Sequence, residues 1–168
     1  LKVRLLDLLI SIESSDENML NREIACVLLG RMLTTHCFYE DESSFNIILR
    51  ALMSSLAQQL HELRLSWDYP EAKGSVVLSS THRELLFYAV SAAFEVPFDR
   101  KKEYEKALLY ACLEELEFGD RTSNSYLAVL YILNHVIAQD RENRRVVGPM
   151  FQTYISPLIE EDSDVYQE

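Results

Sequence analysis

The sequence predicts an all-α protein of about seven helices, stacked in pairs as a right-handed α-solenoid. Apolar residues recur at intervals of three and four along almost the whole chain, which is typical of amphipathic helices. The strand-like stretch "SVVL" at 75–78 is too short to build a sheet. Pairs of helices also repeat with a period near 43 residues, which indicates a stacked helical-repeat protein.

The helix boundaries follow from the apolar periodicity and from local end signals. The expected helices are 1–12, 43–63, 81–94, 100–118, 123–138 and 143–160, together with a second helix inside 14–38, where polar residues before Ile24 are the candidates for its cap. "THRE" combines Thr81 with Glu84 three residues later, so we expect Thr81 to be the N-cap in a capping box. Gly119 is expected to end the fifth helix in the left-handed conformation.

Three further glycine and proline positions carry expectations about packing. Gly30 lies inside a predicted helix, where the absence of a side chain suits a close helix approach. Pro149 is expected in the first turns of the last helix, where a missing N–H costs little. Pro157 is expected to end or kink the same helix.

The helices repeat in the same order three times. Each unit has one helix, a short polar corner and a longer helix, and the units span 22–63, 81–118 and 123–160. Phe45 corresponds to Tyr104, and Tyr104 to Val147, at offsets of 59 and 43 residues, so an inserted loop is expected at 65–80. We therefore expect a single helical-repeat domain over 1–168. Because the first residue is Leu1 rather than Met, we also expect the chain to be part of a longer protein.

The segment "LAVLYILNHVIAQDRENRRVVGPMFQTYISPLI" resembles an armadillo or HEAT unit. Asn143 and Val146–Val147 stand where armadillo units place an Asn-containing turn and a Val/Ile-rich helix. The resemblance covers roughly 22–160 and implies stacked helix pairs with a partner-binding surface. Armadillo carriers of basic peptides line their groove with repeated Trp and Asn, whereas this chain has one tryptophan, Trp67, in the inserted loop.

Charge and cysteine content narrow the range of functions. The chain has 16 Lys and Arg against 27 Asp and Glu, a net charge of −11, which disfavours binding to nucleic acid and to anionic membranes. No apolar run reaches the roughly 18–20 residues that span a bilayer. Cys26, Cys37 and Cys112 lie in apolar helical stretches, and we expect buried thiols in an intracellular protein of the cytoplasm or nucleus.

The motifs of enzymes and metal proteins are absent from the sequence. The four glycines are too far apart for a phosphate-binding loop, and no two of the four histidines are three or four residues apart. We therefore expect no catalytic, cofactor-binding or metal-binding residues and no enzyme activity. "DRENRR" at 140–145 is interpreted as a solvated corner, with contact to an anion or an acidic partner as the alternative.

The outward stripe of the second helices is the main candidate site. In a solenoid these helices lie side by side and line a concave surface, which can bind an extended peptide or a helix. The predicted partner-binding residues are Asn46, Arg50, Lys106, Tyr110 and Gln152, with Trp67 of the inserted loop as a further candidate. The loop either folds back on the helices or presents its apolar side chains to a partner.

The sequence therefore predicts a protein–protein interaction scaffold whose partner is a peptide or helix of mixed charge. The alternative is a structural or oligomerisation element that packs on its parent chain or on a second copy. The broad apolar face of 1–12 favours this alternative, because a terminal helix of a helical-repeat protein normally has a polar outer surface.

Overall fold

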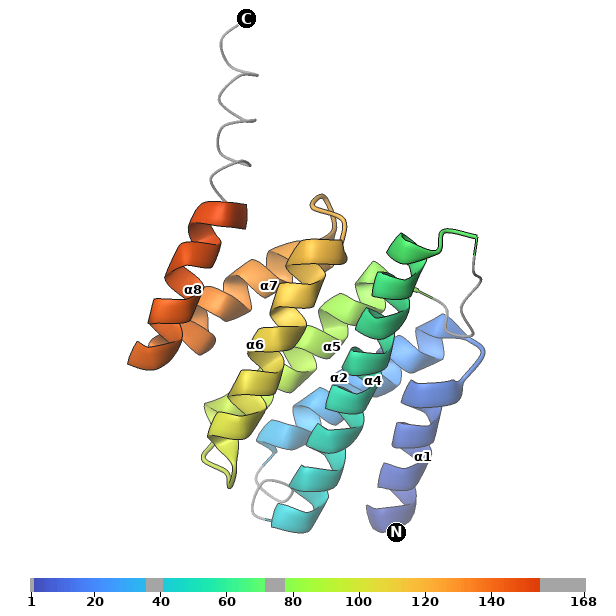
Figure 1. Ribbon diagram of the computed structural model, residues 1–168. Coiled ribbons are helices and arrows are strands. Elements are labelled where there is room, and N and C mark those ends of the chain that lie inside the picture. Colours follow the sequence, from blue (N-terminus) through green and yellow to red (C-terminus); the bar gives the residue numbers. More distant parts are fainter. Residues whose placement is uncertain (1, 36–40, 72–77, 155–168) are drawn as a thin grey trace, which may run out of the picture.

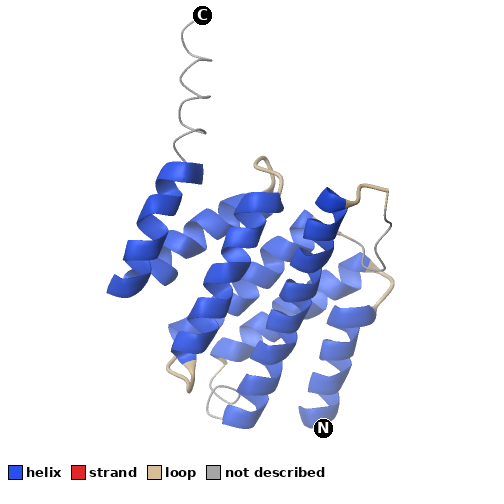
Figure 2. Cartoon of the chain, viewed as in Figure 1, coloured by secondary structure: helices blue, strands red, loops and turns tan. Residues whose placement is uncertain are grey.

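The computed structural model describes residues 2–35, 41–71 and 78–154, and within these ranges the protein is all-helical (Figure 2). This confirms the all-α prediction. The α-helices of these ranges are α1 (Lys2–Ser15), α2 (Met19–Thr34), α4 (Glu42–Asp68), α5 (Ser80–Ala92), α6 (Lys101–Phe118), α7 (Asn124–His135) and α8 (Arg141–Tyr154). The 3₁₀ turns η1 (Ala93–Glu95) and η2 (Ile137–Gln139) extend α5 and α7.

The helices form two rows (Figure 1). We call α1, α4, α6 and α8 the front row and α2, α5 and α7 the back row. In the back row α5 packs between α2 and α7, and in the front row α4 packs between α1 and α6. Each of α1, α4 and α6 also packs against the back-row helix that follows it in sequence.

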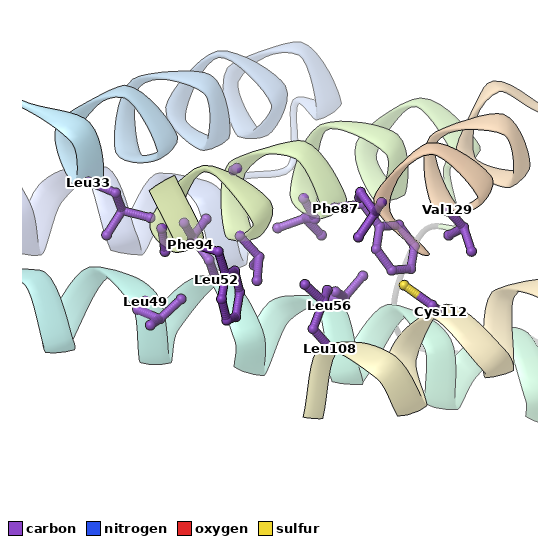
Figure 3. Close-up of a cluster of buried hydrophobic side chains, with 14 of the residues drawn as sticks. Leu33, Leu49, Leu52, Leu56, Phe87, Phe94, Leu108, Cys112 and Val129 are labelled. Atoms are coloured by element: carbon purple, nitrogen blue, oxygen red, sulfur yellow. The ribbon is translucent and has the colours of Figure 1, made fainter. Parts of the chain in front are cut away.

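The hydrophobic core fills the space between the two rows (Figure 3). Leu52 and Leu56 of α4, Phe87 of α5, Leu108 of α6 and Val129 of α7 are all fully buried there. They come from the apolar stripes of their helices, so burial of these stripes holds the rows together.

One predicted helix start is confirmed and another is wrong. The polar residues expected to cap the second helix before Ile24 include its N-cap, because Asn18 accepts a hydrogen bond from the Leu20 N–H. Helix α5 is capped by Ser79, whose Oγ accepts a 3.1 Å bond from the His82 N–H, so Thr81 lies inside the first turn. Ser79 and Thr81 are both residue types that cap helices well, and the structure uses Ser79, the earlier of the two.

The two glycines with specific expectations behave differently. A Cβ on Gly30 would lie 2.8 Å from the Cβ of Ala89, which confirms a close approach of α2 to α5. Gly119 has φ −78° and ψ 162°, so the left-handed conformation predicted for it is wrong. A Cβ on Gly119 would clash with the backbone carbonyl oxygen of Glu115 and would lie 2.6 Å from Oε1 of the same residue, and these close contacts account for the glycine.

The last helix and the inserted loop also differ from their predictions. Helix α8 begins at Arg141, so Pro149 lies two turns inside it rather than in its first turns. Helix α4 continues to Asp68, so residues 65–68 of the predicted loop are helical. Pro157 and residues 75–77 of "SVVL" lie outside the described residues.

Candidate functional site

The exposed side of the front row has two grooves that flank a single tyrosine. Tyr110 lies on α6, is 57% exposed and lines both grooves. One groove runs between α4 and α6 and the other between α6 and α8. A large aromatic side chain is thus presented between two hollows of the surface.

The groove between α4 and α6 has a volume of about 370 Å³ and an apolar floor. Ala57 on α4 and Ala107 and Ala111 on α6 line it, and their small side chains leave the space open. Arg64 and Glu114 face each other across it, with 3.8 Å between Nη1 and Oε1. This groove suits apolar side chains with a charged group at one edge.

The groove between α6 and α8 has a volume of about 400 Å³ and a more polar lining. The Asn143 Nδ2 donates a 3.4 Å hydrogen bond to Oε2 of Glu105 and joins the two helices. Lys102 and Lys106 contribute positive charge, and Glu105, Asp140 and Glu142 contribute negative charge. A ligand of mixed charge would find complementary groups here.

The predicted partner-binding residues are distributed over this surface, but only some line the grooves. Lys106 and Tyr110 do so. Arg50 on α4 and Gln152 on α8 are exposed, and Asn46 on α4 is half-buried, but these three line neither groove. The best-supported part of the predicted site is therefore its centre on α6.

Trp67 lies in the last turn of α4 and not in a loop, which corrects the predicted placement. Its Nε1 donates a 2.6 Å hydrogen bond to the carbonyl oxygen of Phe118, and the two rings meet edge to face at 6.3 Å. The side chain thus folds back onto the end of α6, although it stays 62% exposed.

The arginine-rich "DRENRR" segment forms the beginning of α8. Oδ1 of Asp140 accepts hydrogen bonds from the backbone N–H groups of Glu142 and Asn143, at 2.7 and 3.4 Å, and so caps the helix. Arg144 and Arg145 are exposed. The geometry fits the solvated corner expected from the sequence, while contact with an acidic partner stays a prediction.

A buried polar cluster around Glu13 was missed by the sequence analysis. Its carboxylate contacts His82 Nε2 at 3.0 Å and accepts a hydrogen bond from Ser55 Oγ at 2.5 Å. Arg22 Nε donates to the Glu13 carbonyl oxygen at 2.7 Å. The cluster joins α1, α2, α4 and α5, and all four side chains are buried.

A second buried cluster surrounds Glu115 on α6. Arg83 of α5 donates two hydrogen bonds to its carboxylate, from Nε at 2.7 Å and from Nη2 at 3.3 Å. Ser125 Oγ of α7 donates a third at 2.5 Å. The consecutive residues His82 and Arg83 therefore connect the beginning of α5 to different neighbours on its two sides.

Both clusters join neighbouring helices through buried hydrogen bonds. Ser55 contacts the carboxylate of Glu13 and not the ring of His82, so the cluster around Glu13 lacks the contact between nucleophile and base that hydrolytic sites use.

One sequence signal could have found the two buried clusters. Glu13 stands seven residues after Leu6, and Glu115 seven after Leu108, so both acids lie on buried helix faces.

Two of the three cysteines are confirmed as buried free thiols. Cys26 and Cys112 are fully buried. Burial raises the pKa of both thiols, and the nearby carboxylates of Glu13 and Glu115 raise it further. Neither is suited to act as a thiolate nucleophile at neutral pH. Cys37 lies outside the described residues.

Over residues 2–35, 41–71 and 78–154, no three His, Cys, Asp or Glu side chains gather in a way that could hold a metal ion. None of the described helices is both long and apolar enough to cross a lipid bilayer.

No protein-family profile, curated protein or solved structure matches the chain.

Proposed function

We propose that the chain is a non-enzymatic protein-interaction module, built as a short right-handed α-solenoid of armadillo/HEAT-like helix pairs. Its partner, a peptide or helix of mixed charge, binds across the α4–α6–α8 surface. The observation that carries this proposal is the exposed ring of Tyr110 between two grooves. Exposed aromatic residues beside small pockets are frequent sites of large binding energy in protein interfaces.

The two grooves together favour an elongated ligand over a small molecule. Each is open on one side and shared between neighbouring helices, so a segment that crosses α6 can place side chains in both. The apolar lining between α4 and α6 suits an apolar side chain, and the groove between α6 and α8, lined by two lysines and three acidic residues, suits a segment with charges of both signs. This combination agrees with an amphipathic peptide.

The buried clusters around Glu13 and Glu115 support the non-enzymatic interpretation. They place the serine, histidine, arginine and carboxylate groups that lie closest together inside the helix packing, where hydrogen bonds join them, while Nδ1 of His82 has no hydrogen-bond partner among the described residues. A substrate on the front surface would not reach them.

The proposal can be tested with selected peptides and matched variants. A peptide display library is selected against the chain, and affinities are measured by fluorescence anisotropy for the parent, Tyr110→Ala and Tyr69→Ala. Tyr69 is 64% exposed just beyond α4 and lines neither groove, so it is the matched control. If Tyr110 is a central anchor that contributes about 2 kcal/mol of binding free energy, Tyr110→Ala should weaken binding roughly 30-fold. Tyr69→Ala should bind like the parent.

Charge variants locate the site further. A double variant with Arg50→Glu and Lys106→Glu should bind acidic peptides with lower affinity than the parent, because both cations are exposed on this surface. If the selected peptides bind Tyr110→Ala and this double variant as tightly as the parent, while Trp67→Ala abolishes binding, then the site lies at the end of α4 and the groove proposal is wrong.

A second role, self-association or packing on a parent chain, is supported by a separate observation. Leu5 and Leu8 on α1 are about half exposed, and so are Leu20, Ile24 and Leu28 on α2. These side chains lie at the end of the two rows formed by α1 and α2, away from the grooves.

A further inference from the structure

The face of α2 opposite the core carries an apolar stripe. Leu20, Ile24 and Leu28 follow one another at intervals of four residues and are 60%, 50% and 44% exposed. Residues at this spacing lie one above the other on the same side of a helix. The stripe is thus a continuous apolar ridge about two turns long.

This stripe distinguishes α2 from its neighbour in the back row. Helix α5 packs against helices on both flanks, and its less buried side carries Thr81, Glu84 and Tyr88. Helix α2 ends the back row, with α5 beside it and α1 in the front row (Figure 1). The outward face of α2 is apolar, whereas that of α5 is largely polar. An exposed apolar face of this kind is typical of a helix that packs against another protein surface.

Charged residues of opposite sign stand at the two ends of the stripe. Glu17 immediately precedes the N-cap of α2, and Arg31 lies in its last turn. Both are exposed, and neither forms an ion pair with any residue of the described ranges. At 1.5 Å per residue the two charges are roughly 20 Å apart.

The order of these residues is self-complementary in an antiparallel arrangement. If a second α2 runs antiparallel to the first with Ile24 opposite Ile24, Leu20 stands opposite Leu28 and Glu17 opposite Arg31, because these positions lie equally far from Ile24 in opposite directions. A two-fold axis through Ile24 therefore generates a symmetric contact with apolar residues at the centre and an ion pair at each end.

We infer that α2 is a self-association surface, on which a second copy of this chain docks antiparallel around Ile24. The inference goes beyond the groove function, because the contact uses the back row and leaves the α4–α6–α8 surface free. The partner on this surface is a second copy, because Glu17 and Arg31 match the charges of the same helix when it runs in the opposite direction. A partner of uniform charge would match only one of the two residues.

The size of the contact sets its expected strength. One exposed helix face per partner falls at the low end of specific interfaces, below about 1,200 Å² of total buried area. The net charge of −11 on each copy opposes association at low ionic strength. We therefore expect a weak dimer that dissociates on dilution.

The first test is sedimentation velocity and light scattering of the 168-residue chain over a wide concentration range. The parent should shift from monomer to dimer as concentration rises. Ile24→Glu places two carboxylates at the two-fold axis and should leave only monomer. Leu127→Glu is the matched control, since Leu127 on α7 is 59% exposed, and it should dimerise like the parent. A parent chain that stays monomeric throughout, or an Ile24→Glu variant that still dimerises, overturns the inference.

The second test uses charge reversal and does not depend on the apolar residues. Glu17→Lys and Arg31→Glu each replace two attractive pairs by two repulsive ones, so each variant alone should dimerise about tenfold more weakly. When the two variants are mixed, every pair across the axis has opposite signs, and a mixed dimer should form. The double variant on one chain should also recover dimerisation.

The outcomes separate this inference from the groove function. A mixture that associates no better than either variant alone shows that Glu17 and Arg31 do not meet, and it overturns the antiparallel arrangement. Circular dichroism of each variant checks that the exposed substitutions leave the helices intact. Peptide affinity of Ile24→Glu should equal that of the parent, so failure of dimerisation and failure of peptide binding can be told apart.

Discussion

The buried pair of Arg83 and Glu115 offers a quantitative test of how the rows are held together. The arginine is 5% exposed and the glutamate is fully buried. The carboxylate accepts two hydrogen bonds from Arg83 and one from Ser125, so it connects α6 with α5 and α7. Replacement of Arg83 by leucine removes the positive charge and two of these three donors.

The expected cost follows from what remains in the core. In Arg83→Leu the carboxylate of Glu115 stays buried with only the Ser125 hydroxyl as a donor. Removal of one partner of a buried ion pair typically costs about 3–5 kcal/mol, because the other charge is left uncompensated. Domains of this kind have a free energy of unfolding of about 5–15 kcal/mol, so the loss is a large share of it. At about 2–4 °C per kcal/mol, the melting temperature should fall by roughly 6–20 °C.

A double variant tests whether the uncompensated charge is the cause. Arg83→Leu with Glu115→Leu leaves no buried charge, and apolar replacement of both partners is often close to neutral. The double variant should therefore recover most of the stability that Arg83→Leu loses. Recovery is measured by urea unfolding followed by circular dichroism, with the midpoint and the slope fitted for each variant.

The matched control is Arg64→Leu. Arg64 also joins a neighbouring helix to a glutamate of α6, Glu114, but at 3.8 Å and with both side chains more than a third exposed. Exposed pairs contribute about 0–1 kcal/mol, so this variant should unfold almost like the parent. If Arg83→Leu costs no more than Arg64→Leu, or if the double variant is as unstable as the single one, the reasoning about the buried pair is refuted.

Three further outcomes are expected. Gly30→Ala should lower the free energy of unfolding, measured by urea denaturation, by up to about 2 kcal/mol, because overpacking against α5 exceeds the gain of about 1 kcal/mol in helix propensity; unchanged stability would mean that α2 and α5 separate easily. The hydrogen bond from Lys2 lowers the pKa of Asp41 to about 2, so its stabilising effect is complete above the unfolded-state pKa near 4 and is lost as pH falls towards 2. Asp41→Asn should therefore flatten the pH dependence of melting in that interval, and an identical slope would contradict the assignment. In a Cys37→Ser variant, the Cys26 and Cys112 thiols should resist a thiol reagent until the chain unfolds. Fast labelling of the folded chain would show that they are accessible.

The candidate site was predictable in its elements but not in its shape. An exposed tyrosine and lysine on α6 follow from the outward stripe of an amphipathic helix, which is why Tyr110 and Lys106 could be named from sequence. The groove beside them exists because Ala57 of α4 meets Ala107 and Ala111 of α6. Each alanine alone is an ordinary helix residue, and the space appears only when two helices place their small side chains opposite one another.

The sequence by itself determined that the chain is helical, because this depends on the spacing of apolar residues within a few turns. The same spacing places Leu49, Leu52 and Leu56 of α4 on a buried face, but it does not distinguish that buried stripe from the exposed apolar stripe of Ile24 and Leu28 on α2. The sequence does not decide between Ser79 and Thr81 as the cap of α5, because serine and threonine are both favoured at the N-cap position.

Tertiary structure decided which polar residues meet inside the core. Glu13 and His82 stand 69 residues apart, and Arg83 and Glu115 stand 32 apart. A carboxylate on a buried helix face needs a donor, but the local pattern does not say which helix supplies it. The partner is fixed only when the rows assemble, because burial makes an unpaired charge too costly and selects the packing in which each one is met.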